Sequence, residues 1–183
     1  MARKHVKHAR LEEKISIRLG DGLKVIQPEE QIDCITICGM GGSMIASILE
    51  EGRSRLAPVK RLILQPNHGE EIIRRWLMDH DWELCDERII EEEGHIYEIL
   101  VAKPGDGHKP YINADKELFF GPFLLREKTP IFQLKWKQEK KALEHVLEQL
   151  EKASNSEEIR EKKADITRKI GWIEEVLSDG KRS

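Results

Sequence analysis

Residues 32–42 read Ile-Asp-Cys-Ile-Thr-Ile-Cys-Gly-Met-Gly-Gly, and this stretch decides the fold. The near-continuous apolar run from Ile32 to Cys38 is typical of a strand that is buried on both faces. A glycine turn at 39–42 follows it. Apolar residues then recur at helical spacing, with Gly52 as the stop signal: Met44, Ile45, Ile48 and Leu49. The order strand, tight turn, helix predicts an α/β protein.

The same unit occurs again further along the chain. Residues 61–64 read as a short buried strand, Gln65-Pro66-Asn67 closes it, and residues 70–80 carry a helical pattern. Residues 82–90 and 95–102 pair most simply as an antiparallel hairpin through Glu93-Gly94. Before the deciding stretch, residues 15–19 alternate as a strand and end at Gly20-Asp21-Gly22. We therefore predict a mostly parallel sheet, covered by helices on both faces, that ends in a hairpin.

The composition changes after the hairpin. Pro, Gly, Asp and Asn are frequent from 103 to 129, which indicates a packed connector. Apolar residues at helical spacing then form two narrow stripes, interrupted by the polar residues 153–156. We predict an α/β domain over 1–112, a connector over 113–130 and a coiled-coil helical hairpin over 131–183.

Length and charge limit the possible functions. A chain of 183 residues has room for one compact domain and an extension. The net charge of -3 gives no general attraction to nucleic acid, so any RNA contact must be local. No apolar run is long enough to span a bilayer, and no secretory signal begins the chain, so we expect a soluble cytoplasmic protein.

The three cysteines fit a reducing compartment. Cys34 and Cys38 would lie roughly 13 Å apart along a strand, too far to share one zinc ion. We expect both, and Cys85, to be small buried hydrophobes, and we expect no metal site.

Three turns carry residues that suit a ligand site. Gly39-Met40-Gly41-Gly42 precedes a helix start, where backbone N–H groups favour a polar ligand, although a purely structural turn is the commoner use of such glycines. A nicotinamide fingerprint is weak, because its third glycine would fall on Met44. Asp21, in Gly20-Asp21-Gly22, could accept a hydrogen bond from an adenine amino group or simply cap a turn. Gln65-Pro66-Asn67 offers two amides to a planar base, or merely ends a strand.

Lysines cluster in the predicted helical hairpin. Lys135, Lys137, Lys140 and Lys141 lie close together in sequence and could contact RNA phosphates. Glutamates are interleaved throughout, so a solvated helix face is the simpler interpretation. We expect Trp136 and Trp172 to pin the two helices together rather than to stack on bases.

Taken in order, several segments resemble the TrmK family, bacterial enzymes that methylate N1 of adenine at tRNA position 22. The resemblance rests on the following segments: 17–23, 33–42, 64–67, Gly94-His95-Ile96-Tyr97-Glu98-Ile99-Leu100, Phe120-Gly121-Pro122 and Pro130. It extends from near the first residue to the helical tail. It implies a Rossmann-like class I methyltransferase domain, S-adenosyl-L-methionine as cofactor, tRNA as partner, and a coiled coil that helps to hold the tRNA.

The resemblance also implies roles for the three turns. The family aspartate that matches Asp21 lies at the cofactor's adenine, and the glycine turn matching Gly39 to Gly42 borders its methionine end. The loop matching Gln65 to Asn67 faces the substrate base. N1 of adenine has a lone pair that can attack the sulfonium methyl group directly, so positioning matters more than a general base. Because N1 lies on the Watson–Crick edge, the base must first be unpaired or extruded. No catalytic triad is expected.

The sequence departs from the family at its front. The family begins with an Asp-x-Gly-x-Asp-His loop and a second strand whose acid holds the cofactor's ribose, and neither occurs in the printed residues. We expect an N-terminally incomplete domain in which the strands at 15–19 and 32–38 lack their usual neighbours, and a chain that is inactive or poorly folded. Two alternatives stay open, an RNA- or protein-binding module without catalysis and a dimerising coiled coil. For the full-length form we expect a monomer.

Overall fold

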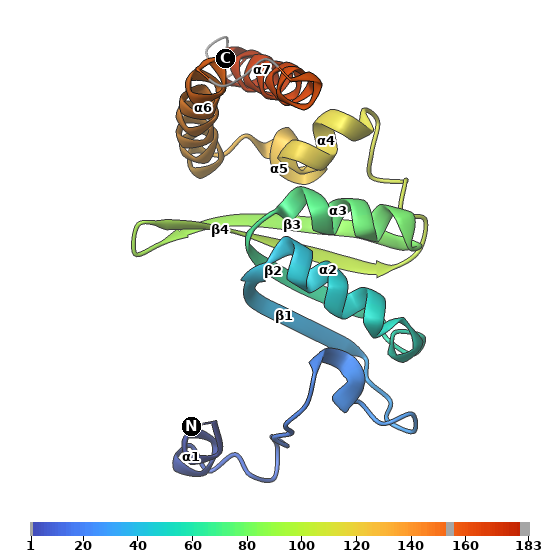
Figure 1. Ribbon diagram of the computed structural model, residues 1–183. Coiled ribbons are helices and arrows are strands. Elements are labelled where there is room, and N and C mark those ends of the chain that lie inside the picture. Colours follow the sequence, from blue (N-terminus) through green and yellow to red (C-terminus); the bar gives the residue numbers. More distant parts are fainter. Residues whose placement is uncertain (1, 153–155, 180–183) are drawn as a thin grey trace.

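The computed structural model describes residues 2–152 and 156–179 of the chain (Figure 1). Its elements are, in chain order, α1 (Ala2–His8), η1 (Gly22–Val25), β1 (Cys34–Gly41), α2 (Gly42–Glu51), η2 (Arg53–Arg55), β2 (Arg61–His68), α3 (Glu70–Asp79), β3 (Trp82–Glu92), β4 (His95–Pro104), α4 (Ala114–Phe120), α5 (Pro122–Glu127), α6 (Pro130–Glu151) and α7 (Glu157–Asp179). Within this part of the chain, no helix combines the length and apolar character that a membrane crossing requires.

The four strands form one mixed sheet in the order β1-β2-β4-β3. β1 and β2 are parallel and connected through α2, whereas β4 runs antiparallel to both β2 and β3. α2 and α3 contact each other and lie over the same side of the sheet (Figure 1). The two strand–turn–helix units and the hairpin are confirmed. The prediction of a mostly parallel sheet is wrong for the described residues, because β4 folds back between β2 and β3 and makes two of the three pairings antiparallel.

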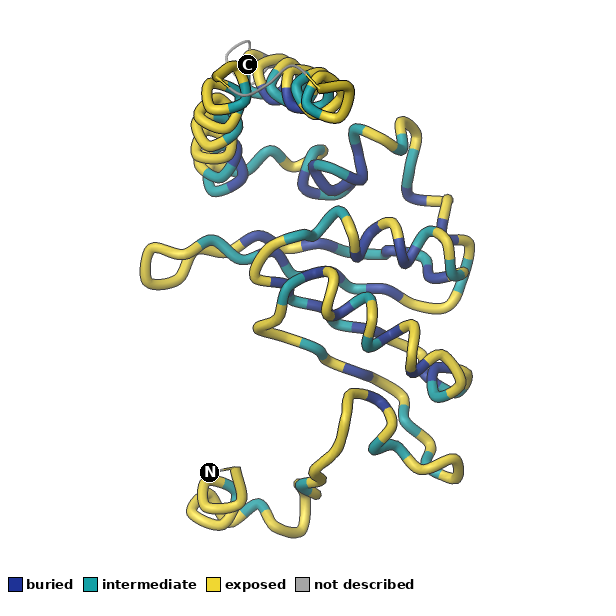
Figure 2. Tube along the Cα trace, in the orientation of Figure 1, coloured by how far each residue is buried: buried dark blue, intermediate teal, exposed yellow. Residues whose placement is uncertain are grey.

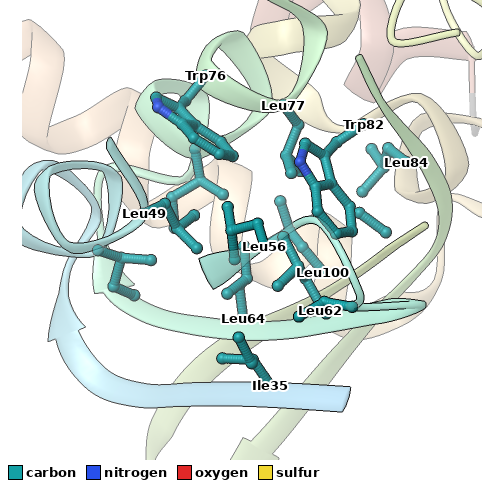
Figure 3. Packing of buried hydrophobic residues seen from close by; sticks show 14 of the residues in the cluster. Ile35, Leu49, Leu56, Leu62, Leu64, Trp76, Leu77, Trp82, Leu84 and Leu100 are labelled. Carbon is teal, nitrogen blue, oxygen red and sulfur yellow. The ribbon is translucent and has the colours of Figure 1, made fainter. Parts of the chain in front are cut away.

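The core lies between the sheet and the two helices. Alternate residues of β2 point into it, and Leu62 and Leu64 are completely buried. Ile35 of β1, Leu49 of α2 and Leu77 of α3 belong to the same cluster (Figure 3). Burying each leucine side chain stabilises the fold by roughly 1.5–3 kcal/mol. This packing holds the carboxyl ends of β1 and β2 side by side at one edge of the sheet.

The predicted strand at 15–19 is not formed. These residues join no sheet in the described part of the chain, and Leu19 is fully exposed. Arg18 instead pairs with the carboxylate of Glu30, and the segment from Ala2 to Gly22 is mostly exposed (Figure 2). Alternation of apolar and polar residues favours a strand only where a neighbouring strand satisfies its backbone N–H and C=O groups. None of the described strands lies next to it.

One face of β1 is uncovered, and this explains a second wrong prediction. Cys34 and Cys38 were expected to be buried but are exposed, and Cys85 is only partly covered. Side chains alternate along β1, so Ile35 faces the helices whereas the two cysteines face the opposite side. Among the described residues the helices α2 and α3 cover one side of this strand only, and the other side meets solvent.

The C-terminal part consists of two packed helices on a short connector. The connector contains α4 and α5. α6 begins where the Thr129 hydroxyl accepts the backbone N–H of Phe132 at 3.2 Å, with Pro130 as the first helical residue. α6 and α7 contact each other along a second apolar cluster that includes Trp136 and Ile173. The two helices are therefore confirmed, while residues 153–155 of the predicted polar break lie outside the described residues.

Candidate functional site

The glycine turn completes β1 and starts α2. Gly39 has a φ of +76°, a conformation that glycine adopts without strain, and a Cβ at this position would meet no atom within 4 Å. At Gly42 the situation is opposite, because a Cβ there would collide with the backbone carbonyl oxygen of Gly69. The turn is therefore open to a ligand on one side and tightly packed against the next loop on the other.

A hydrogen bond connects this turn to the second predicted site loop. The Gln65 side-chain oxygen accepts the backbone N–H of Gly39 at 2.9 Å. The Gln65 amide nitrogen donates to the Pro66 carbonyl at 2.9 Å and lies 3.4 Å from the Asn67 side-chain oxygen. Gln65 thus uses both ends of its amide inside the protein and joins the two turns. Pro66 is buried, and Asn67 is the exposed amide of this loop.

The third predicted turn lies beside α2 instead. Gly22 packs near Ile48, where an added Cβ would come within 3.2 Å of a side-chain methyl group. Asp21 is exposed and pairs with Lys24 at 3.0 Å, and Lys24 also reaches Glu51 at 2.6 Å. Hydrogen bonds from Lys24 to Glu51 and Asp21 raise the pKa of Lys24 to about 12.

A small cavity of about 50 Å³ separates this turn from α2. It is lined by Asp21, Gly22 and Met44, among others, and Met44 stands two residues after the glycine turn. The structure therefore brings Gly39 to Gly42 and Gln65 to Asn67 into direct contact. Gly20, Asp21 and Gly22 approach the glycine turn only through α2, and no hydrogen bond in the described part of the chain connects them to it.

The predicted RNA-contacting lysines differ in their surroundings. Lys140 bridges Glu144 at 3.3 Å and Glu174 at 2.7 Å, and the hydrogen bond to Glu174 raises the pKa of Lys140. Lys137 and Lys141 are exposed on α6. Lys137 and Lys140 line a groove of about 420 Å³ between α6 and α7. Lys137 and Lys141 are therefore more available to a phosphate than Lys140.

Lys135 is a clear departure from the sequence interpretation. Its ammonium group is largely buried and lies 2.7 Å from both Glu70 and Glu98. Burial alone would lower the pKa of Lys135, but these two carboxylates outweigh it and raise the pKa, so the lysine stays charged. Lys135 anchors α6 to the start of α3 and to β4, and it is not a free phosphate ligand. Sequence spacing could not separate it from its exposed neighbours.

A buried arginine extends this cluster of charges. Arg74 of α3 is completely buried and pairs with Glu87 at 2.7 Å and with Glu98. Burial disfavours the charged arginine, but the two carboxylates reverse this and hold its pKa above the ordinary value. Arg74 also donates to the backbone carbonyl of Leu118 at 3.1 Å. The network connects α3, the β3–β4 hairpin and the connector, and no sequence motif predicted it.

The comparison with a family model identifies the chain. The model described as "TrmK: tRNA (adenine(22)-N(1))-methyltransferase" matches residues 1–175. The chain belongs to the TrmK family. A TrmK relative from Bacillus subtilis (strain 168), named tRNA (adenine(22)-N(1))-methyltransferase, is 41% identical over 181 residues, which cover 98% of this chain and 76% of the relative.

Solved structures agree with this TrmK assignment. The crystal structure of the B. subtilis m1A22 tRNA methyltransferase TrmK superposes with a TM-score of 0.86 at 40% identity, covering 96% of this chain and 76% of that one. A Streptococcus pneumoniae candidate tRNA (m1A22) methyltransferase, solved in complex with S-adenosyl-L-methionine, gives a TM-score of 0.82 at 42% identity, covering 96% and 74%. The resemblance inferred from the sequence motifs is thus confirmed, together with the Rossmann-like methyltransferase fold.

Proposed function

We propose that this protein transfers a methyl group from S-adenosyl-L-methionine to N1 of adenine 22 in bacterial tRNA. The observation that carries the proposal is the 2.9 Å hydrogen bond from Gly39 to Gln65, in a chain that the TrmK family model matches over residues 1–175. This bond places the glycine turn next to the loop that offers an exposed amide at Asn67. A cofactor-side turn and a base-side loop at one sheet edge are what methyl transfer between two bound molecules requires.

The glycine turn fits the cofactor. Open space beside Gly39 and the partly exposed Met40 leave room for an extended polar ligand, and backbone N–H groups at the start of α2 suit its polar end. When bound, S-adenosyl-L-methionine supplies an electrophilic methyl group on its sulfonium. We propose Gly39 to Gly42 for its methionine end and Gly20, Asp21 and Gly22 for its adenosine end.

The base-side loop would work by orientation. We propose that Gln65 and Pro66 shape the loop, while the Asn67 amide hydrogen-bonds the extruded adenine. The lone pair on N1 needs no prior deprotonation, so a general base is not required. Holding N1 in line with the methyl group is the main task of these residues.

The C-terminal helices would hold the rest of the tRNA. We propose that α6 and α7 form a coiled-coil hairpin and that Lys137, Lys140 and Lys141 contact phosphates, Lys140 only after leaving its glutamate partners. The organisation into 1–112, 113–130 and 131–183 remains part of this proposal. We further propose a monomer in the full-length form and a cytoplasmic location, where tRNA is modified.

Methylation of defined transcripts tests the function. Protein purified from its source organism is incubated with S-adenosyl-L-methionine and an unmodified tRNA transcript that carries adenine 22, and N1-methyladenosine is located by primer extension. A matched transcript with guanine 22 should remain unmethylated. Methylation of both transcripts, or of neither, contradicts the proposal. Titration of residues 1–183 with S-adenosyl-L-methionine tests the alternative of a non-catalytic binding module, which predicts RNA or protein binding without cofactor binding.

A further inference from the structure

A cleft of about 400 Å³ lies between the end of β2, the start of β4 and the first turns of α6. Three elements contribute exposed amide or imidazole side chains to its lining: Asn67, His68, His95 and Gln138. Two aromatic side chains also line it, Phe119, which is partly exposed, and Trp136, which is almost completely buried. A volume of this size, with a few polar groups around aromatic rings, is within the range of sites that hold small planar ligands.

The position of the cleft follows from the strand order. β2 lies between β1 and β4, so the Gln65–Asn67 loop has the glycine turn on one side and the start of β4 on the other. The antiparallel register, in which Leu64 is opposite Leu100, carries His95 beyond the end of β2. Figure 1 shows the β3–β4 hairpin extending past the sheet on the side where β1 turns into α2. The cleft is therefore adjacent to the proposed base-side loop, on the side away from the cofactor turn.

The charges in the cleft do not suit a phosphate. Lys135 is the one lysine or arginine among its described lining residues, and Glu70 and Glu98 already neutralise it at 2.7 Å each. Glu139 adds an exposed carboxylate to the rim. Phosphate binding needs uncommitted cations, and a carboxylate repels a phosphate. An uncharged heterocycle fits this environment better.

The aromatic floor supports the same ligand class. Phe119 and Trp136 lie with ring centroids 4.6 Å apart. The indole N–H of Trp136 has no hydrogen-bond partner in the described part of the chain. Nucleobases offer ring nitrogens and carbonyl oxygens as acceptors, and proteins recognise unpaired RNA bases by contact with aromatic rings and amide groups. The indole nitrogen is covered, so an acceptor would reach it only after a shift of neighbouring side chains.

We propose that this cleft is a subsite for a second unpaired nucleobase, the one that adjoins the target adenine in the tRNA strand. Gln138 and His95 hydrogen-bond the edge of that base, and the aromatic floor contacts its ring. The proposal rests on the proposed function, because it needs the target adenine at the neighbouring Gln65–Asn67 loop. It makes Gln138 a residue that recognises RNA without contributing to the salt-dependent attraction between lysines and phosphates.

A double-mutant cycle between protein and RNA tests this subsite. Gln138→Ala removes the amide from the cleft, and Gln149→Ala is the matched control, because Gln149 is equally exposed on α6 but does not line the cleft. The protein and both variants are titrated with fluorescent tRNA, either intact or carrying an abasic nucleotide on the 5′ or the 3′ side of adenine 22. The dissociation constant is measured at several salt concentrations.

Gln138→Ala should weaken tRNA binding roughly threefold to tenfold, the loss expected for one hydrogen bond. Its salt dependence should equal that of the unchanged protein, because no phosphate contact is lost. One of the two abasic transcripts should bind the unchanged protein and Gln149→Ala more weakly than intact tRNA does, and the loss should be clearly smaller for Gln138→Ala, which keeps only the contacts of His95 and the aromatic rings.

Equal binding by Gln138→Ala and Gln149→Ala would overturn the subsite. Equal losses for all three proteins on the abasic transcripts would overturn it as well. A third transcript, abasic at position 22 itself, separates this failure from failure of the proposed function. If only that transcript binds more weakly, the subsite is wrong and the function stands. If all three abasic transcripts bind as tightly as intact tRNA, both proposals fail.

Discussion

Replacing Lys135 by methionine should destabilise the protein by about 3 kcal/mol, because it strands two carboxylates. The lysine side chain is 13% exposed, and its partners are 1% exposed in Glu98 and 18% in Glu70. Breaking a buried ion pair by removing one partner typically costs 3–5 kcal/mol. The expected loss is at the lower end of this range, because Glu70 is partly exposed to water and because Arg74 remains beside Glu98.

Urea unfolding followed by circular dichroism measures this loss. Lys137→Met, two positions further along the same helix, is the matched control and should change the free energy of unfolding by no more than about 0.5 kcal/mol, since that lysine is exposed. Glu98→Gln should lower the free energy of unfolding less in the Lys135→Met variant than in the unchanged protein, because in the variant it removes a carboxylate that has lost its lysine partner. Equal stabilities of Lys135→Met and Lys137→Met would refute the structural role given to Lys135.

Three further predictions follow from the site. Gly42→Ala should lower the melting temperature by several degrees, because the added Cβ collides with the Gly69 carbonyl oxygen. Gly171→Ala is the control: its Cβ meets nothing within 4 Å, so it should be neutral or stabilising by roughly 0.5–1 kcal/mol. Equal shifts of the two variants in thermal unfolding would contradict the close packing of Gly42 against Gly69. Gln65→Ala removes the acceptor for Gly39 and should weaken cofactor binding at least severalfold in calorimetric titration, while Gln65→Glu keeps the acceptor oxygen and should retain more affinity. Burial would raise the pKa of Glu70, but Lys135 outweighs burial and lowers that pKa. The stability from this ion pair is therefore present at neutral pH and is lost as the pH falls below the ordinary glutamate pKa of about 4.5. Unfolding free energies measured across acid pH should show that loss, and a flat profile would contradict the prediction.

Local patterns predicted much of the fold. The run at 32–38 with its glycine turn, the strand and helix around Gln65, and the hairpin through Gly94 all form where the sequence placed them. Each is decided by neighbours in sequence, such as a turn glycine or a helical apolar stripe. The strand at 15–19 failed because a strand depends on a partner, which no local pattern supplies. The prediction of a mostly parallel sheet was wrong for a related reason, since strand order is a property of the whole chain.

The site was predictable in outline only. Residue types at the ends of β1 and β2 indicated which turns would meet, because parallel strands end at the same edge. The sequence could not show that Gln65 connects these turns and leaves Asn67 as the exposed amide. Lys135 looked like one more helical lysine until the fold placed Glu70 and Glu98 around it. Such roles depend on contacts between residues that are distant in sequence, and these appear only in three dimensions.

Hydrogen–deuterium exchange on the protein would test the central claim most directly. S-adenosylhomocysteine should slow amide exchange at residues 39–42, and subsequent addition of tRNA should slow it at residues 65–69. These two segments would then respond in sequence as adjoining halves of one site. If the cofactor product protects neither segment, or tRNA protects only surfaces far from Asn67, the glycine turn and the neighbouring loop do not form the methyl-transfer site.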